Sequence, residues 1–136
     1  MDWRDFRKSG HWPTLLAAFL YFDFSFMVWV VLGPLSLYIA QDIALDVSQK
    51  FTVVAIPVLF GALLRVPLGM LSDRFGGRRI AIGLLIFLVI PLSIGWLAPM
   101  RVSTLAATAV MLGAAGSSFA IVLPLASRWY PRDRQG

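Results

Sequence analysis

One arginine stands inside an otherwise apolar stretch of the chain. Arg65 lies in the segment 61–79, GALLRVPLGMLSDRFGGRR, which ends in a cluster of basic residues. Gly61, Gly69 and Asp73 are spaced from it in steps of four residues, so the pattern predicts one face of a helix. The guanidinium is a planar, permanently charged fork of donors, and this shape suits a flat, delocalised oxyanion. The segment therefore offers an arginine that could bind an anion between small neighbours.

Four apolar runs provide the helices that would position this arginine. They cover residues 14–40, 51–72, 79–98 and 103–127, and each reaches the ~20 residues that a helix needs to cross the hydrocarbon layer. The 136 residues are 59% hydrophobic and 14% charged, and a soluble domain of this length has no core large enough for so much apolar surface. We expect an all-α, polytopic membrane helix bundle in which residues 1–136 form one domain embedded in a lipid bilayer.

Turn and breaker residues refine this expectation. Asp46 precedes the second run and is typical of a helix N-cap. Gly33-Pro34 interrupts the first run and predicts a bend there. Pro57 and Pro67 fall inside the second run, where they predict local bends rather than helix ends.

The basic residues are distributed unequally between the two ends of these runs. Lys50 and Arg101 are the only ones in the loops after the first and third runs, whereas nine lie at the other end, at positions 4, 7, 8, 74, 78, 79, 128, 132 and 134. This positive-inside pattern predicts a cytoplasmic N-terminus. We expect the chain in the cell's inner (plasma) membrane. The net charge of +5 then reflects orientation and headgroup contact, and nucleic-acid binding is not expected.

Two other uses of Arg65 compete with anion binding. At 1.5 Å per residue it lies ~12 Å from Asp73, near the bilayer centre, where a charge costs at least ~3 kcal/mol. Asp23 reaches a similar depth, ~15 Å from the cytoplasmic end of its own span, and could pair with Arg65 inside the protein. Snorkelling to the headgroups is the third use, and the distance to either surface disfavours it. The residues alone leave anion binding and the internal ion pair open.

The fourth run combines small residues with one large side chain. Gly113 and Ser117 lie four residues apart and predict a stripe for close helix contact, to which Gly61 would contribute from the second helix. Phe119 lies nine residues before Arg128, so its depth nearly matches that of Arg65. Phe119 could therefore stack on a flat anion, although ordinary packing is the commoner role of such a residue.

The sequence offers little that could support catalysis. Glutamate and cysteine are absent, and the one histidine, His11, precedes the apolar runs. Acid–base pairs, metal clusters and nucleophile triads cannot be assembled within the membrane from the residues that remain. We expect no enzyme activity, no metal and no cofactor, and Asp23 alone offers a carboxyl that could carry a proton.

Several segments resemble one family of membrane transporters. The segment Gly69-x-Leu71-x-Asp73-Arg74-x-Gly76-x-Arg78-Arg79 resembles the loop motif between the second and third helices of the major facilitator superfamily. The family typically has a basic residue where Gly77 stands. Segments that resemble the nitrate/nitrite porter branch are Phe26-Met-Val-Trp29 with Gly33-Pro34-Leu35, Leu59-x-Gly61-Ala-Leu-x-Arg65-x-Pro67-x-Gly69, and Gly113-x-Ala115-Gly116-x-Ser118-Phe119-Ala120 followed by Trp129-Tyr130-Pro131…Gln135-Gly136.

The resemblance implies a twelve-helix transporter of two six-helix halves that moves nitrate or nitrite by alternating access. It implies that Arg65 coordinates the anion and that Phe119 packs against it. The loop motif, and with it Gly69, Asp73, Arg74, Gly76, Arg78 and Arg79, would latch the two halves on the cytoplasmic side. The family's asparagine-bearing fifth helix and its second arginine are absent. We therefore expect the first four helices of a porter, a fragment that needs its missing C-terminal remainder to transport.

Two other functions stay open on these residues. A facilitator for another small anion would show a different pattern of competition for uptake. A four-helix scaffold that binds a partner membrane protein would be stable alone in the bilayer, with Arg65 paired to Asp23.

Overall fold

The computed structural model describes residues 12–99 and 101–128, which form helices and no strand. The elements are α2 (Trp12–Val30), α3 (Leu32–Asp42), α4 (Val47–Phe75), α5 (Gly77–Leu97), α6 (Val102–Gly113), the 3-10 helix η1 (Ala114–Ser117) and α7 (Ser118–Ser127). They form four rods that are long and apolar enough to cross a membrane: Trp12–Asp42, Val47–Phe75, Gly77–Leu97 and Val102–Ser127. The all-α membrane bundle expected from the sequence is confirmed. The basic residues at 4, 7, 8, 132 and 134 and the segment 129–136 lie outside the described residues.

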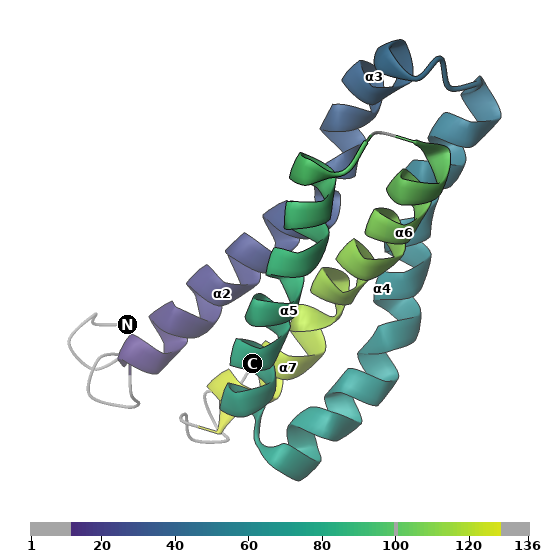
Figure 1. The fold of residues 1–136 in the computed structure, drawn as a ribbon. Coiled ribbons are helices and arrows are strands. Elements are labelled where there is room, and N and C mark those ends of the chain that lie inside the picture. Colours follow the sequence, from purple (N-terminus) through teal and green to yellow (C-terminus); the bar gives the residue numbers. More distant parts are fainter. Residues whose placement is uncertain (1–11, 100, 129–136) are drawn as a thin grey trace, which may run out of the picture.

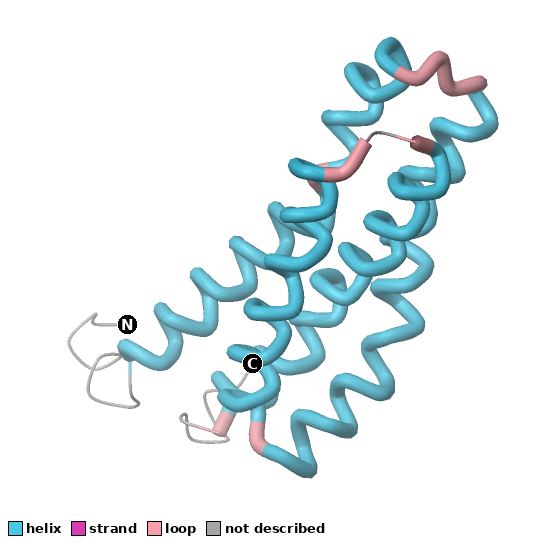
Figure 2. The backbone as a smooth tube through the Cα atoms, viewed as in Figure 1, coloured by secondary structure: helices cyan, strands magenta, loops and turns pink. Residues whose placement is uncertain are grey.

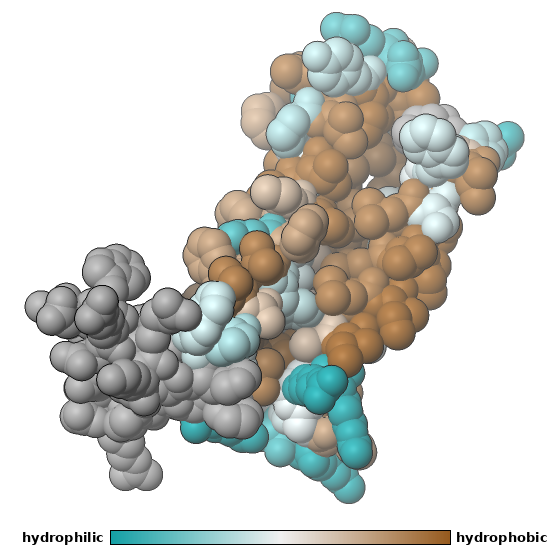
Figure 3. Space-filling view, turned by 90° about the vertical axis from the view of Figure 1, so that its left-hand side faces the viewer, coloured by the Kyte–Doolittle hydropathy of each residue, from teal (hydrophilic) through white to brown (hydrophobic). Residues whose placement is uncertain are grey.

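The rods run alternately up and down the bundle (Figure 1). The start of α2, the α4–α5 turn and the end of α7 lie at the lower end in this view, and the other two connections lie at the upper end. The described basic residues divide in the same way, because Arg74, Arg78, Arg79 and Arg128 belong to the lower end and Lys50 and Arg101 to the upper end. Between the two hydrophilic ends the surface is a broad apolar band (Figure 3).

Short connections join the rods (Figure 2). Gly76 alone separates α4 from α5, and its φ of +91° is one that glycine adopts without strain. At the other end of α4, the Asp46 carboxylate accepts the Ser48 N–H at 3.3 Å, and the Gln49 side chain accepts the Asp46 N–H at 3.2 Å. This capping box satisfies N–H groups that the helix start would otherwise leave unpaired. The second helix is therefore longer at both ends than the apolar run 51–72.

The prolines act through the hydrogen bonds that they cannot make. The first rod is interrupted at Val31, three residues before Pro34, because Pro34 has no N–H to offer the carbonyl of Val30. Pro57 and Pro67 leave α4 unbroken from Val47 to Phe75, as expected.

The fourth rod, made of α6, η1 and α7, forms the centre of the bundle. In its most apolar window 56% of the residues are buried, against 17%, 17% and 22% in the other three rods. Towards the upper end it packs through Leu105, Ala109 and Leu112 against α3 and α4, and towards the lower end through Ala114, Ala115 and Ile121 against α5. Ser117 is fully buried within it.

The second and fourth rods approach each other closely at a pair of glycines. A Cβ added to Gly113 would lie 2.6 Å from the Cβ of Phe60 and 3.2 Å from the carbonyl oxygen of Pro57. A Cβ added to Gly61 would lie 3.1 Å from the carbonyl oxygen of Gly113. Contacts below 3.0 Å essentially do not occur for real Cβ atoms. Larger residues at these positions would push the two rods apart.

The indole of Trp29 ties the first rod to the same contact. Its Nε1 donates a hydrogen bond of 2.8 Å to the carbonyl oxygen of Pro57. The ring also occupies the space beside two glycines, since an added Cβ would come within 2.9 Å of the indole at Gly61 and within 2.6 Å at Gly116. Trp29 therefore fixes α2 against both α4 and η1.

Replacing Gly113 by alanine should destabilise the bundle, because the Pro57 and Gly61 backbone cannot move aside locally. Overpacking of this kind costs roughly 1–3 kcal/mol, so the thermal midpoint of the purified protein in detergent should fall. Gly83→Ala is the matched control, since a Cβ there meets nothing within 4 Å. Equal midpoints for the two variants would contradict the packing described.

Replacing Trp29 by phenylalanine removes the indole N–H but keeps an aromatic ring between the rods. We expect a loss of about 1 kcal/mol in the free energy of unfolding, the usual worth of one such bond. Trp96→Phe serves as the control, because Trp96 is 87% exposed and should tolerate the change. Thermal unfolding of both variants measures the difference in stability. An unchanged free energy of unfolding in the Trp29→Phe protein would show that the Trp29–Pro57 hydrogen bond does not stabilise the bundle.

Candidate functional site

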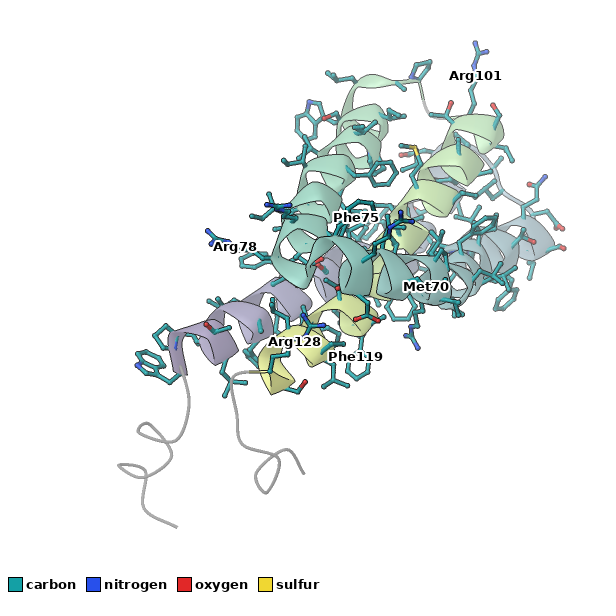
Figure 4. All side chains as sticks on the ribbon, turned by 90° about the horizontal axis from the view of Figure 1, so that it is seen from below. Met70, Phe75, Arg78, Arg101, Phe119 and Arg128 are labelled. Atoms are coloured by element: carbon teal, nitrogen blue, oxygen red, sulfur yellow. The ribbon has the colours of Figure 1, made fainter. Side chains whose placement is uncertain are left out.

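Arg65 lines a pocket between α2, α4 and the fourth rod. The pocket has a volume of about 200 Å³. Its other lining residues are Phe22, Phe26, Trp29, Ala115, Gly116, Ser118 and Phe119. Arg65 and Phe119, the two residues predicted to contact an anion, thus line the same pocket from different rods. Phe119 is 46% exposed and projects outward from α7 (Figure 4), so the pocket opens to the surface of the described bundle.

Three further hollows of this bundle are more apolar than the Arg65 pocket. One of about 420 Å³ lies between α4 and α5, and one of about 220 Å³ lies among α3, α5 and α6. A third, of about 550 Å³, lies among α2, α5 and α7 and includes Arg78 at the lower end. Of these four hollows, the Arg65 pocket is the one whose charged residue belongs to the middle of a rod, whereas Arg78 and Arg79 in two of the others lie in the first turn of α5.

The Arg65 side chain reaches from α4 to η1. Its Nε donates a hydrogen bond of 3.3 Å to the carbonyl oxygen of Gly116. Within residues 12–99 and 101–128, the two terminal nitrogens of the guanidinium form no hydrogen bond and no ion pair. One edge of the planar group is therefore held by the protein, and the terminal fork remains available to a ligand.

Asp23 does not neutralise Arg65 in this structure. It is partly buried on α2, and in the described part of the chain the one ion pair joins Arg128 to Asp73. The internal pair that the sequence left open as an alternative is therefore not formed between the described residues.

Aromatic rings from two rods form one wall of the pocket. The rings of Phe22 and Phe119 meet edge to face at 5.8 Å and 65°. Phe22 lies 5.9 Å from Phe26, which in turn lies 5.7 Å from Trp29. Such contacts are favourable for aromatic pairs and hold the rings in place. Phe22 and Phe26 were not predicted as site residues, although both belong to a visibly aromatic stretch.

The 3-10 helix brings a backbone carbonyl to the pocket. The apolar run 103–127 gave no sign of an interruption, yet η1 divides the fourth rod at Ala114–Ser117. The Ser117 hydroxyl donates to the carbonyl oxygen of Ala114 at 2.6 Å and stabilises this tight turn. A 3-10 segment inside a longer helix often coincides with a functional region, and here its Gly116 supplies the acceptor for Arg65.

The loop motif lies at the lower end of the bundle, away from the pocket. Asp73 and Arg74 are in the last turn of α4, and Arg78 and Arg79 are in the first turn of α5. The helix of the apolar run 51–72 continues to Phe75, and the turn is Gly76 alone.

Two of these motif residues have contacts that limit their roles. The Asp73 carboxylate lies 3.6 Å from the Arg128 guanidinium, and both side chains are more than half exposed, at 69% and 61%. A pair so exposed contributes little to stability. Gly69 faces α7, since an added Cβ would lie 3.8 Å from the Cβ of Ala120.

Gly77, the position that departs from the typical motif, is buried against α7. A Cβ there would lie 3.2 Å from the Ser72 hydroxyl oxygen and 3.5 Å from the carbonyl oxygen of Ile121. A long basic side chain at this position would require the turn to move away from α7.

Comparisons with known proteins cover most of the chain. Residues 14–136 match the family model described as Major Facilitator Superfamily. Over 114 residues the chain is 39% identical to the probable nitrate/nitrite transporter NarK2 of Mycobacterium tuberculosis, which covers 82% of this chain and 29% of that protein. It is 37% identical over 112 residues to the nitrite extrusion protein of Bacillus subtilis, covering 82% of this chain and 28% of that protein.

A third relative extends the match. The probable nitrate/nitrite antiporter NarK1 of Thermus thermophilus is 33% identical over 127 residues, covering 92% of this chain and 27% of that protein. The chain thus spans less than a third of the length of these relatives. No solved structure matches it significantly. The helical architecture and the family model over residues 14–136 together show that the chain belongs to the major facilitator superfamily.

Proposed function

We propose that this chain works as part of a secondary transporter that moves nitrate or nitrite across the membrane by alternating access. The observation that carries the proposal is the Arg65 guanidinium, held at one edge and open at its fork, in a pocket within the apolar band. The names of the relatives support the choice of anion. Because the match covers less than a third of the length of those relatives, we propose that transport requires further helices beyond the four described.

Arg65 would bind the anion through its two terminal nitrogens. Two parallel N–H donors match two oxygens of a planar oxyanion, and charge-assisted bonds of this kind are about twice as strong as neutral ones. The bond from Nε to Gly116 restricts rotation of the side chain, so less rotamer entropy is lost when the anion arrives. Phe119 would form the side wall, with Phe22 holding its ring edge to face.

The surroundings of Arg65 would make this binding both strong and reversible. Arg65 is exposed in the described bundle, so the further helices of the transporter would have to cover the pocket. Once water is excluded in this way, the apolar rings that line the pocket would strengthen the attraction between guanidinium and anion. When the pocket is empty, the Gly116 carbonyl dipole offsets part of the cost of the unpaired charge. A carboxylate bound at the fork would instead compete with the anion, and Asp23 does not occupy it.

The other motif residues would serve the conformational change. We propose that Gly61, Gly113 and Ser117 keep the second and fourth rods together as one rigid unit. The motif formed by Gly69, Asp73, Arg74, Gly76, Arg78 and Arg79 would latch this unit to the rest of the transporter, since its charged side chains are exposed at the end of the bundle. The basic residues at that end would face the cytoplasm, with the protein in the plasma membrane and its N-terminus inside.

The alternatives that the sequence left open are less well supported. The hypothesis of a four-helix scaffold for a partner membrane protein predicts an ion pair between Asp23 and Arg65, which the described residues do not form. Transport of another small anion would use the same fork, and the relatives favour nitrate and nitrite.

Replacing Arg65 by lysine in the transporter that contains this chain should nearly abolish nitrate uptake. A lysine is a point charge that cannot both donate to Gly116 and present two parallel donors, so uptake should fall by at least about tenfold, as expected for losing a hydrogen bond to an ion. Arg101→Lys, at the exposed upper end, is the control and should transport normally. Near-normal uptake by the Arg65→Lys protein in vesicles would contradict the proposal that Arg65 binds the anion.

Replacing Asp23 by asparagine tests the ion-pair alternative. Because Asp23 has no ionic partner among the described residues, the neutral variant should keep normal expression and most of its nitrate uptake. Uptake and detergent-extracted yield are measured side by side with the unmodified transporter. A protein that misfolds on this change would favour the internal pair with Arg65.

A further inference from the structure

Ser118 is a second polar side chain in the Arg65 pocket. It is the first residue of α7, is only 1% exposed and lines the pocket together with Arg65 and Phe119. Among the described residues that line the pocket, the one further polar side chain is Trp29, whose N–H is already donated to the carbonyl oxygen of Pro57. The pocket therefore contains one unused neutral side-chain donor in addition to the guanidinium.

The fold itself makes no use of the Ser118 hydroxyl. A serine inside a helix usually donates to the carbonyl four residues earlier, which here is that of Ala114. The neighbouring Ser117 hydroxyl already donates to that carbonyl at 2.6 Å. Across the described ranges the Ser118 hydroxyl forms no hydrogen bond. The described hydroxyls that are sealed from solvent without a partner are those of Tyr21 and Ser25, and the Ser118 hydroxyl is not among them. Ser118 lines the pocket, where a ligand can accept the hydrogen bond that the fold does not use.

We propose that Ser118 donates a hydrogen bond to the third oxygen of nitrate and thereby sets the preference for nitrate over nitrite. The proposal rests on the function proposed above and extends it from a class of anion to a choice within that class. The Arg65 fork takes two oxygens of either anion. Nitrate then presents a third oxygen on the side away from the guanidinium, whereas nitrite has no third oxygen. The Ser118 bond therefore adds to the binding of nitrate alone.

Equilibrium binding of isotopically labelled nitrate and nitrite to the purified, complete transporter tests this. Ser118→Ala removes the donor and adds no volume. We expect it to weaken nitrate binding by about tenfold and nitrite binding by less than about twofold, since hydrogen bonds to ions contribute at least this much. Retained nitrite binding in the same sample shows that the variant is folded.

Ser25→Ala is the matched control. The Ser25 hydroxyl is also buried and unpartnered, but it is sealed within the bundle and does not line the pocket. This variant should leave both affinities unchanged. An unaltered ratio of nitrate to nitrite affinity in Ser118→Ala, with both anions still bound through Arg65, would overturn the role of Ser118 alone. Failure of the unmodified transporter to bind either anion would overturn the proposed function, and this inference with it.

Discussion

The hydrogen bond between Arg65 Nε and the Gly116 carbonyl links the charge of this protein to its fold. A guanidinium within the apolar band is costly unless its environment is arranged around it. That arrangement needs α4 and the fourth rod to approach to backbone contact, which Gly61 and Gly113 permit. It also needs a carbonyl directed at α4, which the 3-10 turn provides at Gly116. Larger residues at the glycines would separate Arg65 Nε from the Gly116 carbonyl oxygen. Close packing of the two rods is therefore also a condition for the geometry of the pocket.

The features that follow from local sequence were predictable. Four apolar runs give four rods because each must satisfy its backbone within a helix to lie in lipid. Asp46 caps α4 because a carboxylate before a helix accepts its free N–H groups, and Gly76 turns the chain because its positive φ suits glycine. A count of residues at 1.5 Å each gave Arg65 and Phe119 a similar depth on two different helices, and the structure brings both to one pocket. Their role in anion binding stays a prediction.

The features that depend on contacts between rods were not predictable. Nothing in the composition of residues 103–127 distinguishes η1 from the helices on either side, because the turn depends on how the Ser117 hydroxyl and the neighbouring rods pack. The bond from Trp29 to Pro57 joins residues 28 positions apart and has no local signature. Ser118 was not predicted as a site residue for the same reason, because a serine among small residues gives no local sign of whether its hydroxyl has a partner. Helix ends also shifted, because caps extend a helix beyond its apolar part.

A structure of the complete transporter with nitrate bound tests the central claim most directly. The account predicts the anion at the terminal nitrogens of Arg65, with Nε still donating to Gly116 and the Phe119 ring against the anion. It would be contradicted by nitrate bound elsewhere, by an Arg65 guanidinium closed off by Asp23, or by a guanidinium that faces lipid with no cavity beside it.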